Sequence, residues 1–293
     1  MTPFDPHFIL LALAPIFLAF IGWEFLYLRR RPDQGSARYS LADTASNATL
    51  AFLHQVGELA AAAFILSVYQ FFFDWRLFEL PFAWWSLLLA FVLQDFLYYW
   101  FHRFSHQIRW MWAAHVVHHS SERLNLSTAF RQSLMYPLAG MWVFWIPLAI
   151  VGFTPDTIIT VVLLNLAYQF FVHTQAVGRL GPLEAVLNTP SHHRVHHASN
   201  PRYIDRNYAG ILIIWDRLFG TFEPESEQEP CHYGITKPVR THNPITLTFH
   251  EWRDMLADAT APGKTWSHRL NHLIRPPGWQ PEPPPSPRSH TDH

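Results

Sequence analysis

Five apolar stretches, each close to the length of a bilayer-spanning helix, constrain the fold of this 293-residue chain more than any other feature. A helix that crosses a bilayer needs about 20 mostly apolar residues. The sequence therefore predicts an all-α integral membrane bundle with helices at residues 8–28, 48–73, 82–101, 134–152 and 157–172. The last two stretches are separated by only a short turn, so we expect a helical hairpin that spans or re-enters the membrane.

The distribution of arginine predicts how the bundle is oriented. Residues 29–38 contain four Arg and one Asp, and loops rich in Lys and Arg stay on the cytoplasmic side. Because this basic run follows the first apolar stretch, that stretch is expected to be a retained helix and not a cleaved signal peptide. Alternation then places residues 102–133, and everything from residue 173 onward, on the cytoplasmic side of a multi-pass protein.

The overall composition agrees with a membrane protein and excludes several other classes. Charged residues make up 15% of the chain, against about 25% in a typical soluble domain. The formal net charge of -1 gives no reason to expect a nucleic-acid partner. Cys231 is the only cysteine, which excludes an intrachain disulfide and a cysteine-based metal site.

Histidine is unusually frequent and clustered. The chain has 19 His, and ten of them lie between residues 102 and 197. Most of these are three or four residues apart, a spacing that brings side chains together on one face of a helix. Such pairs are His102 and His106, then the H-x-x-H-H boxes His115, His118, His119 and His193, His196, His197, with His173 alone at the inner end of the last apolar stretch.

The number and type of these side chains indicate which metal they bind. Neutral imidazole suits Zn, Cu, Fe and Ni. A structural zinc takes four ligands and is usually rich in Cys, and the sequence contains no H-E-x-x-H zinc-protease motif. Two non-haem iron ions, each with four or five His, would use the whole set. Iron at the edge of a membrane suits an O₂-dependent attack on the alkyl chain of a lipid.

The three boxes, in this order and between these apolar stretches, resemble the fatty acid hydroxylase/sterol desaturase superfamily of membrane di-iron enzymes. The resemblance is closest to the alkylglycerol monooxygenase branch and covers roughly residues 45–225. It is carried by residues 95–106, 112–122, 125–131, 188–197 and 203–222. It implies that the metal ligands are His102, His106, His115, His118, His119, His193, His196 and His197, with His173 as a further ligand. For the branch it also implies a pterin reductant and hydroxylation of an ether lipid beside the ether oxygen.

Five other polar residues are expected to support the ligands. Asp95, seven residues before His102, is either a residue that orients a histidine or a locally paired carboxyl. His192 directly precedes the last box and either orients a ligand or faces away. Asp205, Asn207 and Asp216 are candidates to hydrogen-bond ligand imidazoles and fix their tautomers, with a structural cap as the alternative.

These features together predict a membrane-bound di-iron oxygenase that hydroxylates an ether lipid, a sterol or a fatty acyl chain. It would use O₂ and an external reductant, namely a pterin, a reductase or another electron-transfer protein. A desaturase with the same centre is the alternative, and a His-rich divalent-metal transporter is the alternative of another class. The predicted domains are an N-terminal helix and basic loop (1–44), a catalytic domain (45–225), a cytoplasmic or interfacial segment (226–275) and a disordered Pro-rich tail (276–293).

Overall fold

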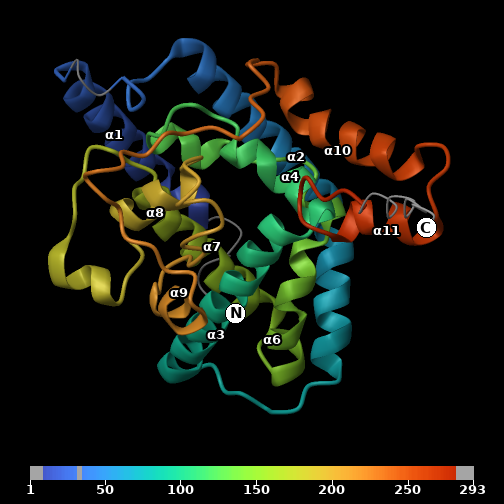
Figure 1. Ribbon diagram of the computed structural model, residues 1–293. Helices are drawn as coiled ribbons and strands as arrows, with labels where there is room; N and C mark the ends of the chain where they lie inside the picture. The colour runs from blue at the N-terminus through green and yellow to red at the C-terminus, as the bar shows by residue number, and fades with distance from the viewer. Residues whose placement is uncertain (1–8, 32–34, 282–293) are drawn as a thin grey trace, which may run out of the picture.

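The computed structural model describes residues 9–31 and 35–281, and within those ranges it is helical, with isolated β-bridges but no β-strand (Figure 1). This confirms the all-α class. The 3₁₀ helices are labelled η. The elements are α1 (Ile9–Arg29), α2 (Leu41–Asp74), α3 (Trp84–Gln107), α4 (Arg109–His119), η2 (Leu126–Phe130), α5 (Tyr136–Ala139), η3 (Met141–Trp145), α6 (Ile146–Val151), α7 (Pro155–Val172), η4 (Gly181–Ala185), α8 (Pro190–His197), α9 (Ile214–Phe219), α10 (Pro244–Thr260) and α11 (Trp266–Ile274).

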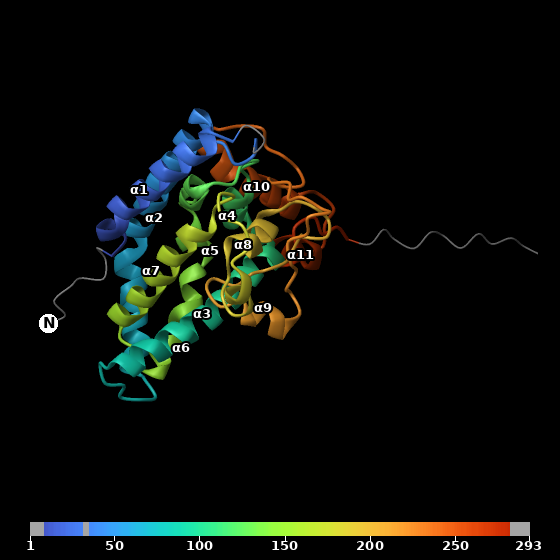
Figure 2. The ribbon, with the colours of Figure 1, turned by 90° about the vertical axis from the view of Figure 1, so that its left-hand side faces the viewer.

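Within residues 9–31 and 35–281, three helices, α1, α2 and α7, are long and apolar enough to cross a membrane. Only 11% of the apolar window of α1 and of α2 is buried inside the protein, and 39% of that of α7. Apolar surface on this scale is unfavourable in water and favourable in lipid. Figure 2 shows α1, α2 and α7 along one side of the molecule, with α8 to α11 away from it. The chain is therefore a membrane protein.

The predicted span at residues 134–152 is wrong as a continuous helix. The segment is divided into α5, η3 and α6, and Gly140 adopts the left-handed conformation (φ 82°) at the end of α5. Pro137 and Pro147 lie in the first turns of α5 and α6, where a missing N–H is tolerated. Hydropathy alone did not reveal these breaks, because the segment is uniformly apolar.

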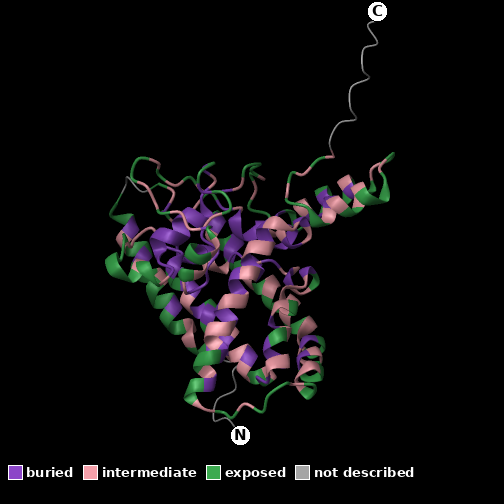
Figure 3. Cartoon of the chain, turned by 60° about the horizontal axis from the view of Figure 1, so that its bottom comes forward, coloured by how far each residue is buried: buried purple, intermediate pink, exposed green. Residues whose placement is uncertain are grey.

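The buried part of the molecule lies toward one end of the long helices. Figure 3 shows buried residues concentrated there, whereas the far ends of the helices are mostly intermediate or exposed. The helix α3 continues six residues past the predicted boundary at residue 101 and carries His102 and His106 into this buried region. The predicted disorder of residues 276–293 concerns mainly residues 282–293, which lie outside the described residues.

Candidate metal centre

The nine histidines predicted to bind metal come together in two neighbouring groups. In each group, one ring nitrogen per residue lies within 4.8 Å of those of all the others. The five-histidine group consists of His102, His106, His115, His119 and His196, and the four-histidine group of His118, His173, His193 and His197. The rings of His119 and His197 stack 4.5 Å apart, so the two groups are adjacent.

Helical spacing explains how four short segments supply both groups. Both α4 and α8 contribute to each group, because their boxes place histidines on adjoining faces of one helix. By contrast, α3 contributes only to the five-histidine group, through His102 and His106. The residue that follows α7, His173, contributes only to the four-histidine group.

Backbone carbonyls accept hydrogen bonds from the Nδ1 atoms of several imidazoles, on the side away from the centre of each group. The contacts are His102 Nδ1 to Tyr208 O (2.8 Å), His118 Nδ1 to Arg131 O (3.2 Å), His173 Nδ1 to Gln169 O (2.6 Å) and His196 Nδ1 to Arg206 O (3.0 Å). A carbonyl oxygen only accepts a hydrogen bond, so each of these Nδ1 atoms carries the proton. Each corresponding Nε2 therefore presents a lone pair toward the centre of its group.

The inward-facing lone pairs fit a bound cation. Nε2 of His118 and Nε2 of His173 are 3.1 Å apart, and neither carries a proton that could join them. Nε2 of His193 lies 2.9 Å from that of His173. Two nitrogen ligands of one metal ion, each at about 2.1 Å, are themselves about 3.0–3.4 Å apart. Without a cation, the lone pairs on these Nε2 atoms repel one another. A bound cation would be coordinated by them, and the Nε2–Nε2 distances that it requires are close to those observed.

Burial keeps the imidazoles in the neutral form that binds metal. All nine rings belong to residues that are at most 8% exposed. Burial first, and mutual repulsion among the histidines second, hold the pKa of His118 and of His197 well below the ordinary value. Burial lowers the pKa of His173 to about 4. Neutral imidazole is the form that coordinates a metal ion, so the site needs no proton release near pH 7.

Among the five supporting residues predicted from sequence, Asp205 contacts a histidine. Its Oδ1 lies 3.4 Å from Nδ1 of His106, and its side chain is 52% exposed. The residue has a positive φ of 61°, a conformation that Asp tolerates better than most residues. A carboxylate is thus placed behind the first histidine box, within ion-pair distance of His106.

The other carboxylates act on the backbone and not on the imidazoles. The side chain of Asp216 accepts hydrogen bonds from the backbone N–H of Tyr208 and of Ala209, both at 2.8 Å. Asp95 accepts from Ile211 N (2.8 Å), Leu212 N (3.0 Å) and Trp215 Nε1 (2.9 Å). Both therefore secure the loop whose Tyr208 carbonyl holds His102. The structure fits the alternatives left open from the sequence, a locally paired carboxyl for Asp95 and a structural role for Asp216, and neither side chain contacts an imidazole in the described part of the chain.

Asn207 and His192 are the remaining two residues expected to support the histidines. The amide of Asn207 donates to the backbone carbonyls of His192 (3.1 Å) and Glu223 (2.7 Å), so it braces the start of α8. The ring of His192 belongs to neither histidine group and packs edge-on against Phe222 at 5.4 Å. The alternative that His192 faces away from the metal ligands therefore fits the structure.

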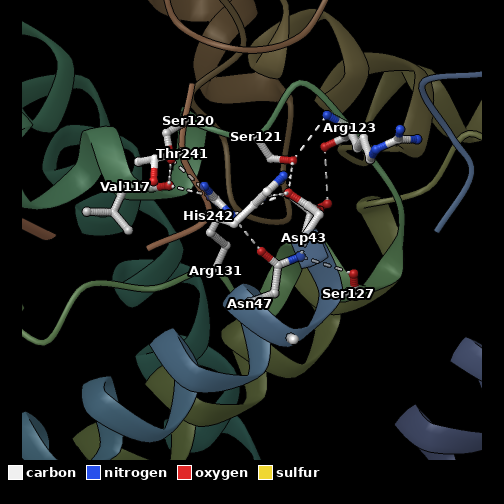
Figure 4. Close-up of polar contacts among 12 residues, drawn as sticks. Asp43, Asn47, Val117, Ser120, Ser121, Arg123, Ser127, Arg131, Thr241 and His242 are labelled. Atoms are coloured by element: carbon white, nitrogen blue, oxygen red, sulfur yellow. Dashed lines mark hydrogen bonds and ion pairs between the residues drawn. The ribbon is translucent and has the colours of Figure 1, made fainter. Parts of the chain in front are cut away.

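Two supporting residues were not identified from the sequence. The hydroxyl of Tyr136 lies 3.2 Å from Nδ1 of His115, which depends on the break in residues 134–152. Arg131 supplies the carbonyl that holds His118, and its buried guanidinium donates to Asn47 Oδ1 (2.9 Å) and Val117 O (3.0 Å). Figure 4 shows Asp43 and Asn47 of α2 meeting Arg131 beneath α4. No local motif indicates either role, because both depend on contacts distant in sequence.

The comparisons with known proteins agree with this arrangement. Residues 87–221 match the fatty acid hydroxylase family. The chain is 43% identical over 251 residues to the alkylglycerol monooxygenase of Homo sapiens, which covers 83% of this chain and 54% of that protein. It is 39% identical over 290 residues to that of Danio rerio (95% and 59%). It is 29% identical over 154 residues to the ornithine lipid hydroxylase of Rhizobium tropici (53% and 46%).

The chain thus spans little more than half the length of these two alkylglycerol monooxygenases. No solved structure gave a significant match. The matched family segment contains all nine clustered histidines, from His102 to His197. Residues 87–221 of this chain therefore form a fatty acid hydroxylase domain.

Proposed function

We propose that this protein is an integral-membrane di-iron monooxygenase that hydroxylates an alkyl C–H bond of an ether lipid. The observation that carries the proposal is the pair of histidine groups, with facing Nε2 lone pairs, beside helices that fit a membrane. The names of the relatives, alkylglycerol monooxygenase and ornithine lipid hydroxylase, favour a hydroxylated lipid over a desaturated one. They equally disfavour a metal transporter.

The nine histidines would hold two iron ions, and bound iron would supply the activation of O₂ and the oxidation of the C–H bond. The overall reaction is RH + O₂ + 2e⁻ + 2H⁺ → ROH + H₂O. A pterin or an electron-transfer protein supplies the two electrons from outside the chain. Hydroxylation of the carbon beside an ether oxygen gives a hemiacetal, which separates into an aldehyde and an alcohol.

The residues of the chain position the ligands and exclude water. The carbonyls of Tyr208 and Arg131 fix the tautomers of His102 and His118. An apolar cluster that includes Tyr98 and Trp145 lies beside the five-histidine group, with the ring of Tyr98 5.4 Å from that of His102. These side chains keep one flank of the centre apolar, which suits the alkyl chain of a lipid.

Metal content and oxygen incorporation test the proposal. Protein isolated from cells should contain iron, and ¹⁸O₂ should place label in an alcohol or aldehyde derived from an alkylglycerol. A His118→Ala variant should lose both the reaction and part of the iron, whereas His232→Ala, an exposed histidine outside both groups, should lose neither. An unlabelled alkene product would support a desaturase instead. Metal flux in proteoliposomes without oxygen consumption would support a transporter.

We further propose that α1 and α2 both cross the bilayer and that the histidine groups face the cytoplasm. The support is the arginine-rich segment between these helices, because such loops stay on the cytoplasmic side. The test uses an impermeant maleimide on intact cells. In a Cys231→Ser background, Leu77→Cys should react in intact cells, because Leu77 is exposed between α2 and α3. The native Cys231 should react only after permeabilisation, and the reverse pattern would contradict the orientation.

A further inference from the structure

A second polar site lies at the first turn of α8, outside both histidine groups. It is a cavity of about 280 Å³, and its lining includes Arg179, Glu184, His192, Arg217 and Glu225. The residue His192 is 2% exposed, and its Nδ1 has no hydrogen-bond partner among the residues described. A buried polar atom without a partner beside a cavity is unfavourable unless a ligand satisfies it.

The charges around the cavity favour an anion. Glu225 is already neutralised by Arg194, whose Nε and Nη2 donate to the two carboxylate oxygens at 2.7 and 2.6 Å. Glu184 accepts through Oε1 from Ser191 Oγ (2.7 Å) and Leu180 N (3.0 Å). These hydrogen bonds involve one carboxylate oxygen and do not neutralise the charge. Among the lining residues, Glu184 is therefore the only acidic residue without an ion-pair partner.

The two arginines of the lining bond to carbonyls and not to carboxylates in the described part of the chain. Arg217 donates to the carbonyl of Glu184 (3.1 Å) and lies over the ring of Phe222 at 3.8 Å, and Arg179 donates to the carbonyl of Glu225. Two cationic charges against one acidic charge leave the cavity with a net positive charge. Guanidinium groups with free N–H donors match phosphate oxygens in geometry as well as in charge.

Exposed apolar side chains lie around the cavity, on segments that contact the membrane helix α7 and α3. Leu183 of η4 is 55% exposed, Val186 is 50% exposed and Leu218 of α9 is 69% exposed. The segment that carries η4 follows α7, and the hydroxyl of Tyr168 in α7 donates to Asn188 O at 2.6 Å. The α9 helix also packs on α3, where the ring of Phe219 stacks 5.2 Å from that of Tyr99. This surface is therefore joined to the membrane helix α7 through Asn188 and to α3 through Phe219.

We infer that the cavity binds the phosphate group of a membrane phospholipid while the exposed apolar side chains of η4 and α9 enter the lipid. A phosphodiester carries one negative charge, which suits the net charge of the lining. Its acyl chains would lie along Leu183 and Leu218, beside the end of α7. Such a lipid would hold the start of α8, the helix that carries His193, His196 and His197, at the membrane surface.

Native mass spectrometry of the full chain in detergent tests this inference with three probes. The probes are dioleoylphosphatidylglycerol, a galactolipid with the same acyl chains, and inorganic phosphate. We expect the phospholipid to bind at least about tenfold more tightly than the galactolipid, because charge-assisted hydrogen bonds to a guanidinium are among the strongest in proteins. Inorganic phosphate should bind more weakly than the phospholipid. Equal affinity for the two lipids, or for free phosphate and phospholipid, would overturn the inference.

Matched variants show whether the cavity is responsible. Arg179→Gln combined with Arg217→Gln should remove the preference for the phospholipid, whereas Arg202→Gln should preserve it. Arg202 is also exposed, but it is paired with Glu223 and does not line the cavity. Leu183→Ser should weaken binding of both lipids and leave that of inorganic phosphate unchanged. An undiminished preference in the double arginine variant, with its iron content intact, would exclude this cavity as the site.

Discussion

The two histidine groups share the helices α4 and α8 but differ in their other histidines and in the residues that support the rings. Both receive ligands from α4 and α8, yet the five-histidine group has the additional pair from α3 and a carboxylate, Asp205, behind His106. The four-histidine group has His173 from the end of α7, and backbone carbonyls accept hydrogen bonds from the outer nitrogens of His118 and His173. One group therefore has one imidazole more than a four-ligand metal site needs and the other has four, although both draw on the same two H-x-x-H-H boxes.

The largest expected effect comes from removing one ligand from each group. His193→Ala leaves the four-histidine group with three imidazoles, so we expect bound iron to fall from about two ions to about one per chain, with loss of turnover. His119→Ala leaves the five-histidine group with four imidazoles, enough for a metal site, and it should keep both ions. Elemental analysis of the purified proteins, together with oxygen uptake on an alkylglycerol, measures both results.

The reverse pattern, in which His119→Ala loses an ion and His193→Ala keeps both, would show that the five-histidine group is the less tolerant one. His232→Ala serves as the control, because it removes an exposed imidazole outside both groups. It reports any effect on membrane insertion or yield that is unrelated to coordination.

The next effect is acid sensitivity of the metal-free protein. Burial lowers the folded-state pKa of His173 to about 4, below the unfolded value of about 6.5. The unfolded chain therefore binds more protons between these values, and stability is present above pH 6.5 and lost as pH falls toward 4. This one residue accounts for about 3 kcal/mol. Thermal unfolding in detergent at pH 7 and pH 5 should show a large decrease, and iron should reduce it. An unfolding temperature independent of pH would contradict the buried, neutral state.

The convergence of the histidines could be predicted from the sequence because helical spacing is a local property. Residues three and four apart share a helix face whatever surrounds them, so the boxes alone indicated which side chains would converge. The supports could not be predicted, because a backbone carbonyl such as that of Tyr208 or Gln169 carries no signature of its residue type. The sequence left Asp95 as either a residue that orients a histidine or a locally paired carboxyl. Only the fold decides between these alternatives, because the partners of Asp95 lie far away in sequence, in the loop at residues 211–215.

A support specific to the four-histidine group is the next test of the comparison. Arg131→Lys keeps the charge near Asp43 but loses the planar fork that reaches Asn47 and Val117, so the carbonyl that orients His118 should shift. We expect the affinity of one iron ion to fall about 10- to 100-fold. Chelator competition measures this. Arg123→Lys, in the same connection between α4 and α5 but partly exposed, is the control. Equal weakening of both ions would mean that Arg131 maintains the fold and not one group.

The smallest effect is expected at Asp205, where the structure gives the five-histidine group its carboxylate. The 3.4 Å contact to His106 is long, and the carboxylate is half exposed, so solvent screens most of its charge. Asp205→Asn keeps the shape and the positive φ that Asn tolerates, and it removes only the charge. We therefore expect less than about a tenfold loss of iron affinity, confined to one ion. A larger loss would mean that the Asp205 carboxylate determines the orientation of the His106 ring. The two groups would then differ in the residues that support them as much as in the number of imidazoles.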